Sequence, residues 1–484
     1  MNSKKLPRHP SGARPPRDQR PPRDKLPARW AALRILSDLR EGRRTARESI
    51  DDLVANAQLA PQEAGLTTEL VMGVVRHRLT LAKVLGTYAV HGWQRVSRQL
   101  QHILMIGAYQ IIWLDTVPDF AAVNEAVNQA RSAGGSKAAR FVNAILRQLL
   151  RDIEAQRVPC AEADLVRAIP VSETACLQLR RPVLSDPAVN PTAHLAESTS
   201  HPTWLVGRWI HHFGREAAEA ICRAGMRRPV VQLRPNRLRI DAEGLINRLR
   251  AEGFQAEPTP ADGAAVPGNV AGLMRSEAFR AGLFQPQDPT AMKAVEHMDL
   301  APGQTVVDLC AGAGTKATQM AEIMKDRGLI LASDKETGRL DQLRANCERL
   351  GVTAIRVVPS DAIEAAVAGL DRLDWILIDA PCSNTGVLAR RPEARYRVDA
   401  RTLEGLAAIQ LGLLNLAARL ARPGTRLLYS TCSLEPEENE KVAAAFAREH
   451  SDWVMTGSEL TLPCSDGPPA TWHDGGYWCS WART

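Results

Sequence analysis

The chain has 484 residues, of which 45% are hydrophobic and 24% are charged, and its formal net charge is +7. A chain of this length has room for about three domains, and the composition is typical of globular proteins. The sequence contains no apolar run of roughly 18 residues and no signal peptide, so we expect neither a membrane span nor secretion. Nine cysteines without a C-x-x-C pair indicate neither a metal site nor a disulfide framework and favour the reducing cytoplasm.

The excess of basic residues lies at the start of the chain. Residues 1–29 contain nine Lys or Arg and two Asp, an excess that equals the net charge of the whole protein. Seven prolines in the same stretch oppose regular structure, so residues 1–27 are predicted to be a disordered basic arm. Two roles fit such an arm equally well: a hold on nucleic acid without sequence preference, or a solubilising extension.

Residues 28–155 are predicted to form an all-α domain. Apolar residues recur at helical spacing over 30–39, 70–75, 103–112 and 141–153, and the third of these helices is so apolar that we expect it to be largely buried. No cluster of acids, bases or thiols is visible in this domain, which indicates binding rather than catalysis. Its basic residues either contact phosphates or, as their spacing favours, lie on solvated helix faces: Arg76, His77, Arg78, Lys137, Arg140 and Arg147.

Two less regular segments follow. Residues 156–200 show little pattern and are interrupted by Pro182, Pro187 and Pro191, so we expect a linker there. Residues 201–296 combine helical patterns at 204–213 and 215–226 with a strand at 230–234. This combination predicts a small α+β subdomain that abuts the domain following it.

A strand, a glycine turn and a helix follow one another from residue 303 onward. The apolar run 305–309 predicts a buried strand, and a helical pattern begins at Thr315. Between them lie only small residues: Cys310, Ala311, Gly312, Ala313 and Gly314. A second strand over 329–332 leads to Asp334. Such a turn brings a ligand close to bare backbone, and an acid at the tip of the next strand can accept hydrogen bonds from a ribose.

Two cofactors fit this turn. Residues 312–317 match the dinucleotide fingerprint G-x-G-x-x-G/A, which permits a nicotinamide dehydrogenase. Asp308 and Cys310 lie between the apolar strand and the first glycine, whereas in a nicotinamide site the strand usually leads directly into the glycine turn. They favour S-adenosylmethionine instead, whose site has no pyrophosphate to bind. The spacing G-x-x-x-x-G-K-[ST] is absent, which excludes a P-loop. A third interpretation is that the turn binds no cofactor and that its glycine only allows close packing in a doubly wound sheet.

The alternation of strand and helix continues beyond this turn. Further strands are predicted over 355–358, 375–378 and 426–429, so residues 297–484 are expected to form a Rossmann-like α/β domain. Ligands bind at the carboxyl ends of parallel strands, and the side chains that follow these strands should therefore meet in one crevice. They are Asp308, Asp334, Asp361, Asp379, Cys382 and Cys432.

Two thiols beside a carboxylate suit methyl transfer to carbon 5 of a pyrimidine. That carbon becomes nucleophilic only after a thiolate has added to carbon 6. The reaction needs one nucleophilic cysteine, an acid near the ring nitrogen and a group that assists the final elimination. Cys432, Asp379 and Cys382 have these chemical types, although their positions alone do not tell which cysteine attacks. The thiols expected to be inert core residues are Cys160, Cys176, Cys222, Cys347, Cys464 and Cys479.

The sequence resembles the RsmB/Sun-type ribosomal RNA cytosine-C5 methyltransferases. The resemblance rests on Asp379-Ala380-Pro381-Cys382 and on Ser430-Thr431-Cys432-Ser433, with Pro436-Glu437-Glu438-Asn439 behind the second motif. Shorter matches are Gln287-Asp288, Arg391-Pro392-Glu393 and Asp474-Gly475-Gly476-Tyr477-Trp478. Residues 28–155 resemble the NusB-like RNA-binding domain that precedes the catalytic domain in this family. Only the basic arm and residues 156–200 lie outside the resemblance.

The resemblance implies an S-adenosylmethionine-dependent enzyme that forms 5-methylcytosine, with small-subunit (16S) ribosomal RNA as its partner. It also implies that Cys432 is the nucleophile, that Cys382 assists product release and that Asp379 contacts the target base. The small α+β subdomain would bind RNA, and the protein would act as a monomer away from membranes. The implied cofactor pocket consists of Cys310, Ala311, Gly312, Ala313, Gly314, Thr315, Lys316, Asp334, Asp361 and Asp379.

One departure from the family pattern concerns the glycine turn. The family's turn reads A-x-P-G-G-K, whereas this chain has Ala313 and Thr315 in place of the proline and the second glycine. This difference bears on cofactor affinity more than on the type of reaction. It also leaves a second function open, an RNA-binding ribosome-assembly factor with a weak or inactive catalytic domain, although both thiols and every acid of the motifs are present.

Overall fold

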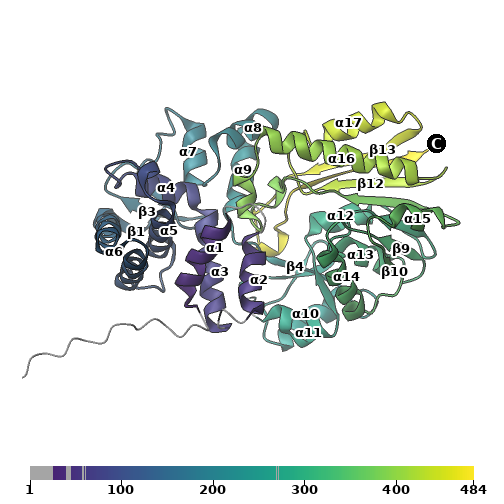
Figure 1. Ribbon diagram of the computed structural model, residues 1–484, viewed down its shortest axis with the longest axis horizontal. Helices are drawn as coiled ribbons and strands as arrows, with labels where there is room; N and C mark the ends of the chain where they lie inside the picture. Colours follow the sequence, from purple (N-terminus) through teal and green to yellow (C-terminus); the bar gives the residue numbers. More distant parts are fainter. Residues whose placement is uncertain (1–25, 40–44, 57–58, 60, 269, 271) are drawn as a thin grey trace, which may run out of the picture.

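The computed structural model describes residues 26–39, 45–56, 59, 61–268, 270 and 272–484. Figure 1 shows a helical region on one side of the molecule and a large sheet covered by helices on the other, with α8 (Thr203–Phe213) and α9 (Arg215–Met226) between them. Apart from Leu26 and Pro27, the expected basic arm lies outside the described residues.

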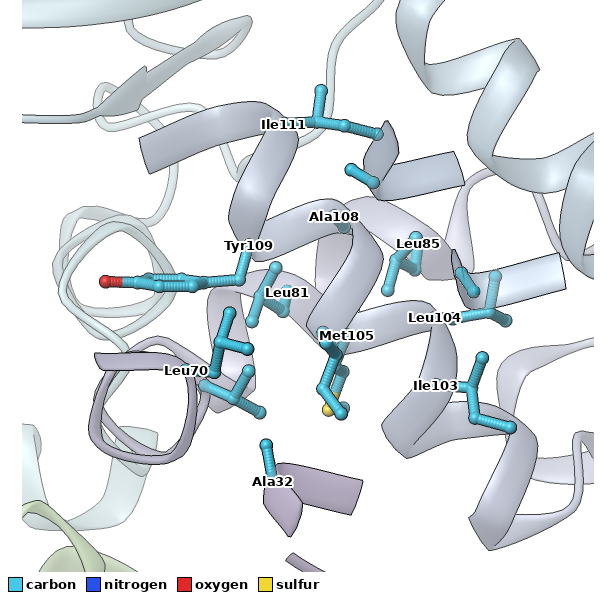
Figure 2. Close-up of a cluster of buried hydrophobic side chains, with 14 of the residues drawn as sticks. Ala32, Leu70, Leu81, Leu85, Ile103, Leu104, Met105, Ala108, Tyr109 and Ile111 are labelled. Atoms are coloured by element: carbon cyan, nitrogen blue, oxygen red, sulfur yellow. The ribbon is translucent and has the colours of Figure 1, made fainter. Parts of the chain in front are cut away.

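The N-terminal domain is all-α, as predicted. It contains α1 (Ala28–Asp38), α2 (Ala46–Ala55), α3 (Pro61–Arg76), α4 (Arg78–Gly86), α5 (Arg98–Trp113) and α6 (Asp119–Asp152). Every residue of α5 from Ile103 to Ile112 is buried, which confirms the expectation for this segment. Figure 2 shows its side chains among Ala32 of α1, Leu70 of α3, and Leu81 and Leu85 of α4. Helix α6 is kinked at Gly134 and Gly135.

The expected linker is folded. Residues 153–179 form a three-stranded antiparallel sheet of β1 (Ile153–Pro159), β3 (Ala175–Leu179) and β2 (Ala168–Pro170), in that order, and α7 (Pro191–Ser198) follows. The apolar side chains of Ile169, Leu177 and Leu179 belong to the core of the helical domain. The prediction of a linker is wrong because these strands show no regular alternation of buried and exposed residues: four consecutive residues of β3 are buried against the helical core.

The next segment is the expected small α+β subdomain. After α8 and α9, it contains β4 (Val231–Pro235), α10 (Ala242–Ala251), β5 (Glu257–Thr259), β6 (Gly263–Val266), α11 (Glu277–Arg280) and β7 (Phe284–Pro286). Its four strands form an antiparallel sheet in the order β5-β6-β4-β7. Leu205 and Trp209 of α8 pack in one apolar cluster with Leu388 and Leu434 of the C-terminal domain, so the subdomain abuts that domain.

The C-terminal domain is a Rossmann-like α/β fold built on a seven-stranded sheet. Five parallel strands form the expected part: β8 (Thr305–Asp308), β9 (Leu329–Ala332), β10 (Ile355–Val357), β11 (Trp375–Asp379) and β12 (Arg426–Thr431). Two further strands, β13 (Trp453–Thr461) and β14 (Gly476–Arg483), extend the sheet in antiparallel fashion and were not predicted. The order is β10-β9-β8-β11-β12-β14-β13.

Helices cover both faces of this sheet: α12 (Pro289–Glu296), α13 (Thr315–Ile323), α14 (Thr337–Leu350), α15 (Ile363–Ala368), α16 (Ala400–Leu420) and α17 (Glu440–Glu449). Among the described residues, α16 is the one helix whose length and composition alone would allow it to cross a membrane. Its Leu414, Ala417 and Ala418 lie in the core beside Ile376 and Ile378 of β11. This packing is that of a helix that covers a sheet.

Candidate active site

The parallel strands bring the predicted site residues to one edge of the sheet. The central strand β8 lies between β9 and β11, and β12 follows β11. Asp379 ends β11 and pairs in register with Ser430 of β12, two residues before Cys432. The turn that follows β8 and the two thiol loops therefore lie side by side, as the sequence predicts.

The glycine turn is held by backbone contacts and by close packing. Gly314 has φ of +85°, and a Cβ atom there would lie 2.1 Å from Cδ1 of Leu343. Gly312 has φ of +55°, no atom lies within 4 Å of the position of its Cβ, and its N–H donates to Oδ2 of Asp334 at 2.9 Å. Thr315 is the first residue of α13. The glycine that the backbone requires is thus retained, whereas Thr315 occupies a helical position that any residue can adopt.

Beneath this turn lies a carboxyl group with one unpaired oxygen. Asp308 is 1% exposed, and its Oδ1 accepts the Cys310 N–H at 3.2 Å. Among the described residues, Oδ2 of Asp308 and Oγ of Ser333 are buried without a hydrogen-bond partner. Burial, together with the nearby Asp379 carboxylate, raises the pKa of Asp308 to about 7. The same two causes, burial first and then the neighbouring carboxylates, raise the pKa of the Cys310 thiol.

A lysine from the turn reaches the acid at the end of β11. Nζ of Lys316 lies 2.6 Å from Oδ2 of Asp379, and Oγ of Ser430 donates to the other oxygen at 2.9 Å. The Asp379 side chain is 37% exposed, so it faces the open side of the site. Asp361 lies in the turn after β10 with its side chain exposed, at the edge of the sheet.

The two thiols are in contact. Sγ of Cys382 and Sγ of Cys432 lie 3.1 Å apart, and the Cys432 N–H donates to Sγ of Cys382 at 3.3 Å. The hydrogen bond with Cys432 and burial together raise the pKa of the Cys382 thiol well above its usual value. Oδ1 of Asn384, a residue with φ of +63°, lies 3.3 Å from Sγ of Cys432 as an acceptor.

A buried glutamate holds both thiol loops. Oε1 of Glu438 accepts the Ser383 N–H at 2.9 Å and Nε2 of Gln410 at 3.0 Å. Its Oε2 accepts the hydroxyls of Ser433, at 2.5 Å, and of Ser383. Ser383 follows Cys382 and Ser433 follows Cys432, so one carboxylate fixes the backbone on both sides of the thiol pair. The sequence pointed to Glu438 only through its place in the family motif.

A second buried network joins the shorter family motifs. The guanidinium of Arg390 donates to Asp474 at 2.5 Å and to Asp288 at 3.0 Å, and the Asp474 N–H donates to Asp288. Burial and the neighbouring Asp288 raise the pKa of Asp474 to about 7. Arg390 was missed as a site residue, although it precedes Arg391-Pro392-Glu393, because no local pattern shows that three distant segments meet at its side chain.

Two other expectations need correction. Arg76 was expected on a solvated helix face or at a phosphate, but it is 5% exposed and lies where the helical domain meets the catalytic domain. Lys137, Arg140 and Arg147 are exposed as expected. Of the thiols expected to be core residues, Cys176, Cys222 and Cys479 are buried, whereas Cys160, Cys347 and Cys464 are half-buried.

Comparison with protein families assigns each of the three folded regions. Residues 295–466 match the family of 16S rRNA methyltransferases RsmB/F, and residues 26–151 match the NusB family. Residues 201–267 match the ferredoxin-like domain of RsmF/B-like methyltransferases.

Relatives and solved structures agree with these matches. The probable ribosomal RNA small subunit methyltransferase B of Bacillus subtilis is 32% identical over 87% of this chain and 88% of its own length. The probable enzyme of the same name from Synechocystis is 30% identical over 90% and 92% of the two chains. The crystal structure of PH0851 shares the fold, with a TM-score of 0.70 and 21% identity over 94% of this chain and 99% of that one.

The cofactor of this family fits the site described above. Within the described part of the chain, the turn has open space at Gly312, a carboxylate at Asp334, and buried oxygens of Asp308 and Ser333 that have no hydrogen-bond partner. Such a set of backbone and oxygen groups suits the ribose and the amino acid portion of S-adenosylmethionine. The chain belongs to the family of ribosomal RNA small subunit methyltransferases B, which are S-adenosylmethionine-dependent.

Proposed function

We propose that this protein methylates carbon 5 of a cytosine in small-subunit ribosomal RNA, with Cys432 as the covalent nucleophile. The observation that carries this proposal is the contact between the two thiols, 3.1 Å apart, beside a strand that ends in Asp379. A methyltransferase that acts on a nucleophilic oxygen or nitrogen has no need of a thiol pair, whereas carbon 5 of a pyrimidine must first be activated.

The reaction divides the work among three side chains. The thiolate of Cys432 forms a bond to carbon 6, and the π electrons of the ring move to carbon 5, which takes the methyl group. Asp379, as the acid, gives a proton to the ring nitrogen as negative charge develops there, and takes it back when carbon 5 attacks the methyl group. Solvent water then takes the proton on carbon 5, the electrons of that C–H bond restore the double bond between carbons 5 and 6, and the bond from carbon 6 to sulfur breaks with release of Cys432 as a thiolate. The Cys382 thiol, 3.1 Å from Sγ of Cys432, assists this release by donating a hydrogen bond to the departing thiolate.

The cofactor pocket consists of the turn 310–316 together with Asp334, Asp361 and Asp379. S-adenosylmethionine supplies the methyl group on a cationic sulfonium, which favours a site with several carboxylates. Gly312 and Gly314 leave the backbone accessible, and Asp334 is available for the ribose once its bond to the Gly312 N–H is exchanged. The retained Gly314 argues against a vestigial catalytic domain, because a turn that no longer binds a ligand has no need of this conformation.

The RNA contacts are assigned to the NusB-like domain and to the α+β subdomain of residues 201–296. A cytosine within a duplex cannot reach the thiol, so the target base lies in an unpaired segment or is flipped out. We propose that the chain acts as a monomer.

Trapping of the covalent intermediate tests the proposal. Because Cys382 assists release, Cys382→Ala should accumulate a protein–RNA adduct when incubated with S-adenosylmethionine and unmethylated small-subunit ribosomal RNA. Cys432→Ala and the double variant should give none. Electrophoresis under denaturing conditions measures the adduct, and bisulfite sequencing of the RNA locates the modified cytosine. Absence of both adduct and modified cytosine would favour an RNA-binding assembly factor.

A further inference from the structure

The loop between Cys382 and α16 touches the helical domain at two points. Within it, the short 3-10 helix η5 (Pro392–Tyr396) packs against α3. Nη2 of Arg76 donates to the carbonyl of Ala389 at 2.9 Å, and the hydroxyl of Tyr396 donates to the carbonyl of Val75, also at 2.9 Å. Val75 and Arg76 are the last residues of α3. The catalytic domain thus supplies a hydrogen bond that the end of a helix otherwise lacks.

The same loop contacts the proposed nucleophile. Nη1 of Arg391 donates to Oδ1 of Asn384 at 3.0 Å, and this oxygen is the one that accepts from Sγ of Cys432. Nδ2 of Asn384 donates to the carbonyl of Cys382 at 2.7 Å. A chain of contacts therefore leads from α3 through residues 389–391 to Asn384 and to the sulfur of Cys432.

The hydrogen bond from Arg76 to the carbonyl of Ala389 involves a buried charge. The Arg76 side chain is buried, its Nε has no hydrogen-bond partner among the described residues, and the acceptor of its Nη2 is a neutral carbonyl. Burial lowers the pKa of Arg76 to about 10. Nη2 of this buried guanidinium keeps its hydrogen bond only while the carbonyl stays in place, so a movement of Ala389 removes a contact that offsets part of the cost of burying the charge.

We propose that the end of α3 is a positioning element for catalysis. Through Arg76 and Tyr396 it fixes the loop of residues 382–396, and this loop in turn orients the thiol of Cys432. The helical domain then contributes to the chemical step in addition to binding RNA. This inference rests on the proposed role of Cys432 as the nucleophile.

The test compares Tyr396→Phe and Arg76→Lys with Lys83→Ala in the full-length protein. Lys83 is a matched control because it also crosses from the helical domain, pairing with Glu197 at 2.6 Å, but does not touch the loop. Two quantities are measured: the rate of alkylation of Cys432 by iodoacetamide as a function of pH, without RNA, and the single-turnover rate of methylation at saturating RNA. Filter binding gives the RNA dissociation constant, and thermal melting confirms folding.

We expect both loop variants to lower the single-turnover rate by about tenfold and to shift the pH profile of alkylation, because a displacement of 1 Å has effects of this size or larger. RNA affinity should stay within about twofold of the wild type, and Lys83→Ala should behave like the wild type. Unchanged alkylation and turnover in both variants would overturn the proposal and leave the domain a docking role only. A Cys382→Ala protein that forms no covalent adduct, together with no modified cytosine in RNA treated with the wild type, would reject the proposed function, whereas the alkylation profile tests the coupling independently.

Discussion

The thiol loops and the cofactor turn lie at the same edge of one sheet and are held in different ways. Around Cys382 and Cys432, side chains supply the fixing contacts, and both oxygens of Glu438 are hydrogen-bonded. At the cofactor turn, the backbone conformation and the close packing at Gly314 fix the structure instead. Beneath this turn, Oδ2 of Asp308 has no hydrogen-bond partner among the described residues.

This difference shows which part of the site is complete before a ligand binds. A nucleophile must be oriented in advance, and a satisfied network of buried hydrogen bonds gives that rigidity. A cofactor pocket must instead keep free hydrogen-bonding groups for its ligand. The thiol side is therefore expected to be sensitive to the loss of single side chains, and the cofactor side to any added bulk.

The largest effect is expected for Glu438→Gln. An amide replaces one acceptor oxygen with a donor, so at least one buried donor among Ser383, Ser433 and Gln410 loses its partner. The free energy of unfolding, measured by urea denaturation, should fall by about 2–4 kcal/mol, and adduct formation should slow by roughly 100-fold.

The neighbouring Glu437→Gln is the control for this prediction. Glu437 pairs with Arg208 and Lys441 near the surface, so its replacement should lower the free energy of unfolding by about 1 kcal/mol at most. Equal effects of the two substitutions would show that the Glu438 network does not set the geometry of the thiols.

An intermediate effect is expected for Gly314→Ala at the cofactor turn. A side chain in the left-handed region costs about 1–2 kcal/mol, and the added methyl group meets Leu343. Affinity for S-adenosylmethionine, measured by calorimetry, should fall by about tenfold or more. Gly338→Ala serves as the control, since no atom lies within 4 Å of its Cβ position and it lies in α14. If Gly314→Ala binds the cofactor like the wild type, the turn is not the binding element.

The smallest effect, and one that depends on pH, is expected for Asp308→Asn. The folded-state pKa of Asp308 is raised to about 7, so the folded protein binds this proton more tightly than the unfolded chain. Protonation of Asp308 contributes fully to the free energy of unfolding below the pKa that this carboxyl has in the unfolded chain, about 4. It is lost as the pH rises through about 7.

Asparagine removes this dependence while keeping an oxygen for the Cys310 N–H. The Tm of Asp308→Asn minus the Tm of the wild type should therefore increase from pH 5 to pH 8 in cofactor-free protein. Asp371→Asn, at an exposed position after α15, is the control and should follow the wild type at each pH. A pH-independent difference for Asp308→Asn would contradict the raised pKa.

Local patterns in the sequence determined much of the fold. The period of apolar residues places α1, α3, α5 and α6, and short apolar runs place five parallel strands, of which four are followed by an acid and the fifth by Cys432. The order of these strands along the chain also brings Asp379, Cys382 and Cys432 to one edge, because parallel strands expose their carboxyl ends together. These features are predictable because each depends on residues that are near neighbours in the chain.

The remaining features depend on contacts between distant segments. Whether residues 156–200 fold was decided by the helical core onto which β3 packs. The role of Glu438 was decided by its approach to Ser383, 55 residues away, and the burial of Arg76 by Ala389, 313 residues away. A glutamate or an arginine looks the same in the sequence whether it is solvated or buried, and only the tertiary structure determines which hydrogen-bond partners replace water.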